Sequence, residues 1–305
     1  MAIDQKFAQS NDHHNLSGKS ALIVGGTQGI GLGIAKVLAR RGSSVTVAGR
    51  NKVSGDKAIN QIKEESTSEG RTFRFTPVDL ESNKDVERFA SQFSKNEFDF
   101  IIWSAGIFPS GPRRETNEGI ELAFQVNYLS RYVGYQLLIP CLKDGGRLLT
   151  INAPFVDNTF DRFQPQVDVD DFEFKKPDRF ESTQANIFNI TGCLYNDYLV
   201  IHLANQHPTK FFAHGHPGYV PTNLLDNSGV DRKVLGGIFT NVKFTQRTAE
   251  EYGEIATYIL TDEELGKKNG LLFDQDANVL KQSEFEKNVN GSEKLFEYSK
   301  KLTGL

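Results

Sequence analysis

Cysteine, methionine and tryptophan are all scarce in this sequence. Its 305 residues include two cysteines, one methionine and one tryptophan. Two cysteines in a chain of this length exclude a disulfide framework and fit a reduced compartment. We therefore interpret Cys141 and Cys193 as small buried apolar residues.

Long apolar runs and an excess of positive charge are also absent. No run approaches the roughly 18–20 apolar residues that a membrane span requires. The formal net charge is -4, with acidic and basic residues mixed along the chain, so no basic face for nucleic acid is expected. Residues 1–18 are polar, contain no apolar signal-peptide core, and are interpreted as a flexible arm. These features predict a cytoplasmic protein that acts on a small-molecule substrate.

Segments typical of strands and helices alternate after this arm. Strands are expected at 20–24, 44–48, 72–77, 98–103, 147–152, 210–214 and 270–273, and helices at 30–40, 53–65, 86–93, 118–138, 183–205, 249–260 and 294–302. This alternation is typical of a parallel sheet with helices on both faces. We predict one α/β domain over residues 19–305, with a Rossmann-type, doubly wound parallel sheet in three α/β/α layers.

Two helix starts have the spacing of a capping box, Ser82 with Asp85 and Thr248 with Glu251. Two parts of the chain lie outside the regular alternation. Residues 157–179 are acidic and rich in Phe, without a clear period, and an excursion of this length is often functional. Residues 224–305 are expected to form a C-terminal extension on the substrate side.

The clearest motif is a glycine-rich turn between the first expected strand and the first expected helix, Val24-Gly25-Gly26-Thr27-Gln28-Gly29-Ile30-Gly31. Gly25 allows a sharp turn, Gly29 allows close approach of a pyrophosphate, and Gly31 allows tight packing of the helix. The helix N-terminus offers N–H groups and a positive dipole end to the phosphates. The residues predicted to bind a dinucleotide here are Gly25, Thr27, Gln28, Gly29, Ile30 and Gly31.

Arg50 ends the second expected strand, where an acidic residue would hydrogen-bond a ribose 2′-hydroxyl and favour NAD. An arginine at this place pairs instead with a 2′-phosphate, and Asn51 and Lys52 follow it. We therefore predict NADP(H) as the cofactor, with Arg50 and Asn51 among its binding residues.

Together these motifs resemble the short-chain dehydrogenase/reductase family, over about residues 19–302. The family's turn reads Thr-Gly-x-x-x-Gly-x-Gly, and this chain departs from it only at Val24. The resemblance implies that Asp79 and Leu80 lie at the adenine and that Asn127 has a structural and proton-relay role. It further implies that the nicotinamide side of the cofactor is lined by Ser104, Ala105, Gly106, Pro217, Gly218, Val220 and Thr222.

The chain departs from the family at the residues that carry its chemistry. The family has a Ser after the fifth strand and a Tyr-x-x-x-Lys on the next helix, which together orient the substrate and move its proton. Here Ala153 stands at the Ser position, and no Tyr-x-x-x-Lys occurs between Ala153 and Pro217. This pattern is closest to fungal members of the family that lack the usual set.

Two placements of the expected helix at 183–205 are possible. One takes Tyr195 as the acid and puts Leu199 at the Lys position. The other keeps the family's spacing to the Pro-Gly segment and puts Ile187 and Thr191 at the two positions; we favour it because the acid belongs in the early turns of this helix. The candidate catalytic residues are therefore Asn127, Asn152, Thr191 and Tyr195.

His214 and His216 have a spacing that a strand-borne metal site can use, but no carboxylate or Cys cluster accompanies them, and no metal is predicted. Arg113 is expected near the pocket mouth, as a solvated cation or as a group that binds an acidic substrate. The sequence leaves the oligomeric state open.

The retained cofactor motifs and the missing catalytic set leave three functions open. The first is an NADP(H)-dependent oxidoreductase that acts on a carbonyl or alcohol with a non-standard active site. The second is a redox-neutral cyclase or isomerase on the same scaffold, and the third is a non-catalytic NADP(H)-binding protein.

Overall fold

The computed structural model describes residues 3–66, 69–108, 112–152, 168–176, 184–222, 246–282 and 287–305. One sheet of seven parallel strands forms the middle layer, in the order β3-β2-β1-β4-β5-β6-β7. The strands are β1 Ser20–Val24, β2 Ser44–Gly49, β3 Phe73–Pro77, β4 Phe98–Trp103, β5 Leu142–Ile151, β6 Phe211–Gly215 and β7 Leu271–Phe273. The predicted Rossmann-type sheet is confirmed, although β5 begins earlier than the sequence indicated.

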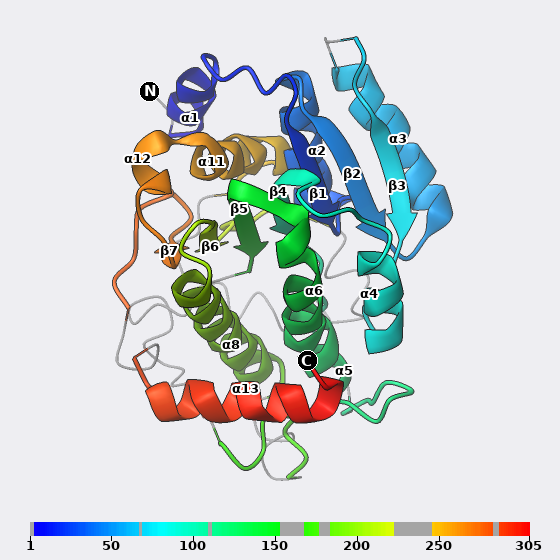
Figure 1. Ribbon diagram of the computed structural model, residues 1–305, viewed down its shortest axis with the longest axis vertical. Coiled ribbons are helices and arrows are strands. Elements are labelled where there is room, and N and C mark those ends of the chain that lie inside the picture. The colour runs from blue at the N-terminus through cyan, green and yellow to red at the C-terminus, as the bar shows by residue number, and fades with distance from the viewer. Residues whose placement is uncertain are drawn as a thin grey trace.

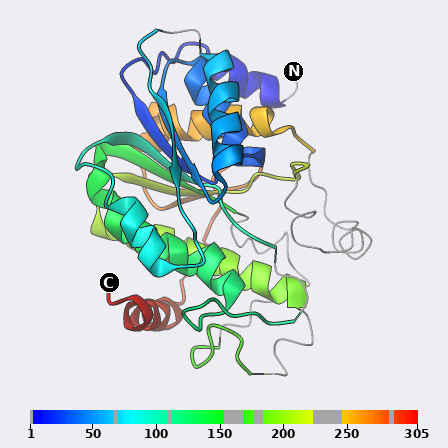
Figure 2. The ribbon, with the colours of Figure 1, turned by 90° about the vertical axis from the view of Figure 1, so that its right-hand side faces the viewer.

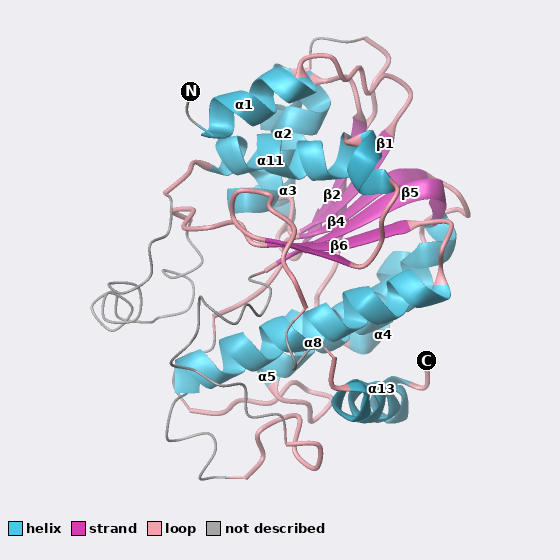
Figure 3. Cartoon of the chain, turned by 90° about the vertical axis from the view of Figure 1, so that its left-hand side faces the viewer, coloured by secondary structure: helices cyan, strands magenta, loops and turns pink. Residues whose placement is uncertain are grey.

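Side chains of β1, β2, β4, β5 and β6 alternate between two hydrophobic cores, one on each face of the sheet, whereas the edge strands β3 and β7 contribute to one core only. In β1, Leu22 and Val24 enter one core, whereas Ala21 and Ile23 enter the other. This burial on both sides explains the nearly continuous apolar strands. One face is covered by α1 Ile3–Asn11, α2 Gly29–Arg40, α3 Lys52–Glu65 and α11 Ala249–Thr261, and the other by α4 Asn83–Ala90, α6 Ser130–Leu138 and α8 Gln184–Gln206, as Figures 2 and 3 show.

The C-terminal helix α13, Val289–Thr303, lies across the outer side of α8 and α6 (Figure 1). Leu295 is fully buried there, and Tyr128 bonds Ser299 with 3.0 Å between the two hydroxyl oxygens. The short helix α12, Glu263–Gly266, connects α11 to β7. No helix in the described part of the chain is long and apolar enough to cross a membrane.

The single helix expected over 118–138 is shorter and interrupted. Gly119 takes a left-handed φ of 74° in a turn closed by its N–H to Thr116 O, so the chain becomes helical only at α5, Leu122–Phe124. A π-helical segment, η1 Gln125–Leu129, then precedes α6, and the 3-10 turn η2, Ile139–Cys141, follows it. Such π-helical turns are frequent at functional sites, and Asn127 lies within this one.

The two expected capping boxes have different outcomes. Thr248 and Glu251 form both hydrogen bonds of the box at the start of α11, as predicted. At α4 only half of the box exists, because Ser82 accepts from Asp85 N whereas the Asp85 carboxylate binds Asp79 N at 2.6 Å.

The interpretation of residues 1–18 as a flexible arm is wrong for the part that the structure describes. Helix α1 packs on α11, with Phe7 4% exposed and its ring centroid 5.1 Å from that of Tyr258. Leu16 is also buried. The sequence signal was missed because nine residues with few apolar side chains have little periodicity of their own.

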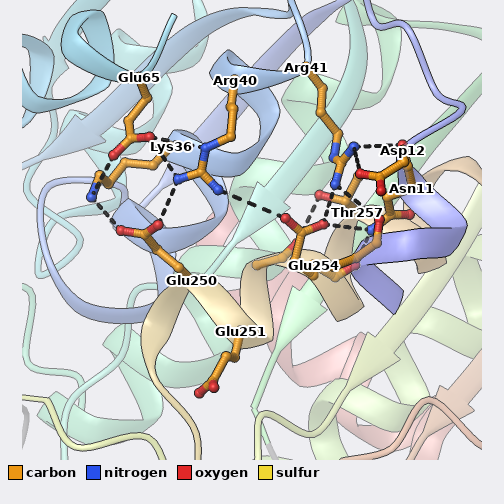
Figure 4. A network of polar contacts seen from close by, with 12 residues as sticks. Asn11, Asp12, Lys36, Arg40, Arg41, Glu65, Glu250, Glu251, Glu254 and Thr257 are labelled. Carbon is orange, nitrogen blue, oxygen red and sulfur yellow. Dashed lines mark hydrogen bonds and ion pairs between the residues drawn. The ribbon is translucent and has the colours of Figure 1, made fainter. Parts of the chain in front are cut away.

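Charged side chains fix this helix to the domain (Figure 4). Asn11 Nδ2 donates to Glu254 Oε2 at 2.9 Å, and Arg41 Nη2 lies 2.7 Å from the same oxygen. Arg41 Nη1 also donates to Asn11 O. The neighbouring ion pairs join α2, α3 and α11 through Lys36, Arg40, Glu65 and Glu250.

We expect Glu254→Gln to lower the free energy of unfolding by roughly 1–3 kcal/mol, because it removes the closer of the two carboxylates that pair with the largely buried Arg41 and leaves only the exposed Asp12, 3.6 Å away. The amide hydrogens of α1 should then exchange faster. Chemical denaturation and hydrogen exchange measure the two effects. The exposed Glu293→Gln is the control and should change stability by less than about 0.5 kcal/mol; equal behaviour of the two variants would contradict the anchoring role.

Candidate functional site

A pocket of ≈ 350 Å³ opens at the carboxyl ends of the central strands. The chain runs outward from β1 through β2 to β3 and then returns to pair β4 with the other side of β1. Ligands of open parallel sheets bind at such a reversal of strand order. The pocket is accordingly lined from the ends of β1, β2, β3 and β4 and from the segment after β6.

Most of the predicted cofactor residues line this pocket. They are Gly25, Thr27, Gln28, Gly29, Ile30, Arg50, Asp79, Leu80, Ser104, Ala105, Gly106 and Thr222. The predicted residues that do not line it are Gly31, Asn51, Asn127, Pro217, Gly218 and Val220.

Three of the predicted residues that do not line the pocket have structural roles near it. Gly31 packs α2 against the glycine turn, because a Cβ there would stand 2.3 Å from Gly25 O. Asn51 caps α3 by accepting from Ser54 N. Gly218 takes a left-handed φ of 70° in the segment that leads to Thr222.

The glycine turn fits a group that needs close backbone contact. Gly25 has a φ of 86°, and a Cβ on it would lie 2.5 Å from Ala105 N. The N-cap residue of α2, Gln28, has extended backbone and makes no side-chain cap hydrogen bond. A helix that begins without a side-chain cap beside a pocket offers its first N–H groups and its dipole to an anion. The residues present therefore suit a pyrophosphate.

A hydrogen-bonded frame holds the loop after β4. Ser104 N and Ala105 N both donate to Val24 O, at 2.8 and 3.1 Å. The Asn127 side chain makes two hydrogen bonds with the backbone of Ile107. It accepts from the Ile107 N–H at 2.8 Å and donates to the Ile107 carbonyl at 2.9 Å. Asn127 therefore acts on the pocket through Ile107, which lines it.

A buried arginine supports the same loop from below. Arg131 is 1% exposed, and its Nη2 donates to Ala105 O at 2.9 Å and to Ile151 O at 3.0 Å. Its Nη1 donates to Thr150 Oγ1 at 3.1 Å. Burial lowers the pKa of Arg131, but a guanidinium stays protonated in proteins. Arg131 therefore places a fixed positive charge between the ends of β4 and β5.

None of the described candidate catalytic residues, Asn127, Asn152 and Tyr195, lines the pocket. Asn152 follows β5, and its Oδ1 lies 3.6 Å from Cys193 Sγ. Tyr195 is 2% exposed in an aromatic cluster, with ring centroids of Tyr128 and Phe172 at 5.4 and 5.9 Å, and it does not line the pocket. Thr191 lies in α8, but its side chain, like that of Ile187 and all of Ala153, lies outside the described residues.

Beneath the pocket, His214 and Asp197 form a fully buried pair with 2.6 Å between Nδ1 and Oδ1. Burial holds the pKa of His214 well below its usual value, and the charges of Arg131 and His216 add to this effect. Burial thus favours the neutral imidazole, in which Nδ1 is the nitrogen that donates to the carboxylate. Among the described residues no group of three or more His, Cys, Asp or Glu side chains is arranged to hold a metal ion.

A second buried carboxylate cluster adjoins the site. In the described part of the excursion, residues 168–176, Glu173 is 1% exposed and accepts from Glu121 N at 2.8 Å. Tyr298 of α13 donates to its other oxygen. Phe174 contacts Ala123 in a small core against which the pocket residue Ile107 packs. Arg113 pairs with Glu115 at 2.5 Å and lies 3.8 Å from Glu173, which makes it a structural cation here.

Sequence reasoning missed several residues of the site. The additional pocket residues are Val24, Gly49, Val78, Glu81, Ile107, Val126 and Pro221. Arg131 lies four residues after Asn127, and that helical spacing was a signal that could have placed both on one side of the helix. Asp197 carried no such signal, because its partner His214 is on another element.

Comparison with known proteins identifies the relationship. The profile of the short chain dehydrogenase family matches residues 19–160. A chloroplastic short-chain dehydrogenase of Brassica napus, TIC 32 A, is 28% identical over 298 residues, covering 95% of this chain and 90% of the relative. A WW domain-containing oxidoreductase of Drosophila melanogaster is 37% identical over 120 residues, but the match spans 39% of this chain and only 29% of that protein.

Solved structures share the fold at low identity. A crystal structure from Mycobacterium paratuberculosis superimposes with a TM-score of 0.70 at 20% identity, covering 97% of both chains. A short chain dehydrogenase of Burkholderia cenocepacia in complex with NADP gives 0.63 at 20% identity, with 87% of this chain and 98% of that chain covered. The chain is thus related to the short-chain dehydrogenases in sequence and shares their fold.

Glu121 makes stability depend on pH. Burial, as the largest cause, raises the pKa of this carboxyl from 4.5 to about 7, and the charge of Glu173 contributes further. A raised carboxyl pKa means that the folded state favours the protonated form, so the associated stability is complete below about pH 4.5 and is lost as the pH rises through about 7. We expect Glu121→Gln to be more stable than the wild type by roughly 1–3 kcal/mol at pH 8, and about equal to it at pH 4.5.

Urea unfolding at several pH values measures this difference. A glutamine at 121 keeps an oxygen that accepts from Phe124 N, so the cap of α5 is retained. The exposed Glu293→Gln is again the matched control. A stability difference between wild type and Glu121→Gln that stays constant from pH 4.5 to pH 8 would disprove the raised pKa.

Proposed function

We propose that this relative of the short-chain dehydrogenases is an oxidoreductase that binds NADP(H) over Gly25–Gly31 and acts on a carbonyl or alcohol substrate. The observation that carries the proposal is the pocket at the β1/β4 reversal, which is lined by the start of α2, whose N-cap Gln28 makes no side-chain cap hydrogen bond. When bound there, the nicotinamide would supply or accept the hydride. The family profile supports the same reaction class.

The preference for NADP(H) rests on Arg50. It follows β2 and lines the pocket at the end where a ribose of the dinucleotide is expected. Structural neighbours described as complexes with NADP and with NADPH, from Burkholderia cenocepacia and from a metagenomic library, are consistent with this preference.

The chain's own residues divide the remaining tasks. Ser104 and Ala105 bind Val24 O, and Asn127 holds Ile107, so the loop beside the nicotinamide is rigid. Arg131 adds positive charge behind that loop, where a substrate oxygen would become negative during hydride addition. We assign these two residues to positioning. Asn152 and Thr191 are the candidates for supplying the proton to the substrate. Tyr195 is a weaker candidate, because it is packed among aromatic rings.

The usual Tyr-x-x-x-Lys relay is missing, so the proton transfer should be slow. General acid–base catalysis contributes about 10² to 10⁴ in rate, and we expect turnover to be lower than that of an ordinary reductase by a factor in that range. Cytoplasmic location also remains our prediction, from the low cysteine content and the lack of a long apolar run.

We expect Arg50→Gln to weaken NADPH binding about tenfold and to leave NADH binding nearly unchanged, because only NADPH carries the 2′-phosphate. Fluorescence titration of the reduced cofactors measures both affinities. Lys52→Gln is the matched control, since Lys52 is an exposed cation two residues away that pairs with Asp56 and does not line the pocket. Equal losses in the two variants would refute a specific role of Arg50.

Stopped-flow loss of NADPH absorbance with a panel of aldehydes and ketones tests the reaction itself. Slow but saturable oxidation of NADPH is the result expected. Product formation without consumption of NADPH would favour the redox-neutral cyclase or isomerase. Tight binding without any product would favour a binding protein, and rates equal to those of ordinary reductases would show that the catalytic residues are wrongly placed.

A further inference from the structure

We propose that Glu81 is a specificity-determining residue, which holds Arg50 in an ion pair and thereby reduces the preference of the pocket for the 2′-phosphorylated cofactor. This inference rests on the proposed function, because it concerns how the same pocket distinguishes NADP(H) from NAD(H). Glu81 would thus influence the choice of cofactor, a role that cannot be inferred from the glycine turn or from Arg50 alone.

The two side chains meet at the rim of the pocket. Arg50 follows β2, Glu81 follows β3, and both line the pocket. Arg50 Nη1 lies 2.6 Å from Glu81 Oε1. An incoming 2′-phosphate must therefore either replace the Glu81 carboxylate on Arg50 or share the guanidinium with it.

The loop that carries Glu81 is fixed by its own hydrogen bonds. Glu81 N donates to Asp79 Oδ1 at 3.1 Å, and Asp79 N donates to Asp85 Oδ2 at 2.6 Å. Arg88 in turn binds the Asp85 carboxylate at 2.6 Å. The Glu81 backbone is thus anchored to the start of α4, so its carboxylate stays at the rim when Arg50 moves.

The charge of the lining strengthens the argument. Among the described residues that line the pocket, the charged side chains are Arg50, Asp79 and Glu81, one positive and two negative, which sum to -1. The nearby Lys52 does not compensate, since its ammonium lies 2.7 Å from Asp56 on its own helix. A dianionic 2′-phosphate therefore enters a rim whose net charge repels it, whereas a 2′-hydroxyl can donate to Glu81.

The exposure of the pair sets the size of the effect. The Arg50 side chain is 61% exposed and that of Glu81 is 39% exposed. Exposed ion pairs are weak and screened by solvent, so a phosphate can displace Glu81 from Arg50. Breaking this ion pair moderately lowers the affinity of the pocket for NADP(H). We conclude that the pocket accepts both cofactors, with an NADP(H) preference smaller than Arg50 alone would give.

The test compares the full chain with Glu81→Gln, which removes the charge and keeps the size of the side chain. We expect NADPH to bind about three- to tenfold more tightly to Glu81→Gln than to the wild type in low salt, and NADH to bind equally or more weakly. The gain should shrink at high salt. In an Arg50→Gln background the effect of Glu81→Gln on NADPH should be clearly smaller, because the two side chains act as a pair.

Asp56→Asn is the matched control. It makes the same change of charge on an exposed partner of a neighbouring cation, away from the pocket lining, and should leave both affinities within about twofold. Unchanged NADPH and NADH binding in Glu81→Gln would overturn the inference, as would equal effects of Glu81→Gln and Asp56→Asn. Those outcomes leave the proposed function intact, whereas a wild-type protein that binds neither cofactor would overturn both.

Discussion

The close approach of two turns, one after β1 and one after β4, is the constraint on which the rest of the site depends. The carbonyl of Val24 accepts hydrogen bonds from both Ser104 and Ala105, and any side chain on Gly25 would collide with Ala105 N. This contact brings the glycine turn and the loop after β4 to one edge of the sheet. The pocket exists because β1 and β4 are neighbours there although 73 residues of chain lie between Val24 and Phe98.

Buried polar groups below this edge hold the second turn in place. Asn127 and Arg131 bind the backbone at Ile107 and Ala105, from one turn of the η1–α6 region. Each makes hydrogen bonds to partly buried backbone carbonyls, which offset the free-energy cost of removing a polar group from water. The buried pair His214 and Asp197 lies on the adjoining strand and helix. The described part of the chain thus has a densely bonded polar layer under its pocket.

The sequence predicted the sheet well and the connections less well. All seven strands and the three-layer architecture follow from apolar runs and alternation, because burial on both faces imposes that pattern locally. Two of the errors concern helices whose ends are held by residues outside the helix. Helix α1 is held by Glu254 and Arg41. The capping box at Ser82 is incomplete because the Asp85 carboxylate accepts a hydrogen bond from Asp79 N. The contacts of Glu254 join residues more than 200 positions apart, and the bond between Asp85 and Asp79 N is not part of a capping-box pattern.

For the site, the sequence by itself determined the glycine turn, Arg50 and the loop 104–106, because each depends on residue types at the end of a single strand. Only the tertiary structure decided which residues join them. It brought Glu81 against Arg50 and Arg131 under Ala105, and it buried Tyr195 among other rings. The physical reason is that the carboxyl ends of parallel strands converge in space, so a side chain's partners depend on strand order and register, which no local pattern records.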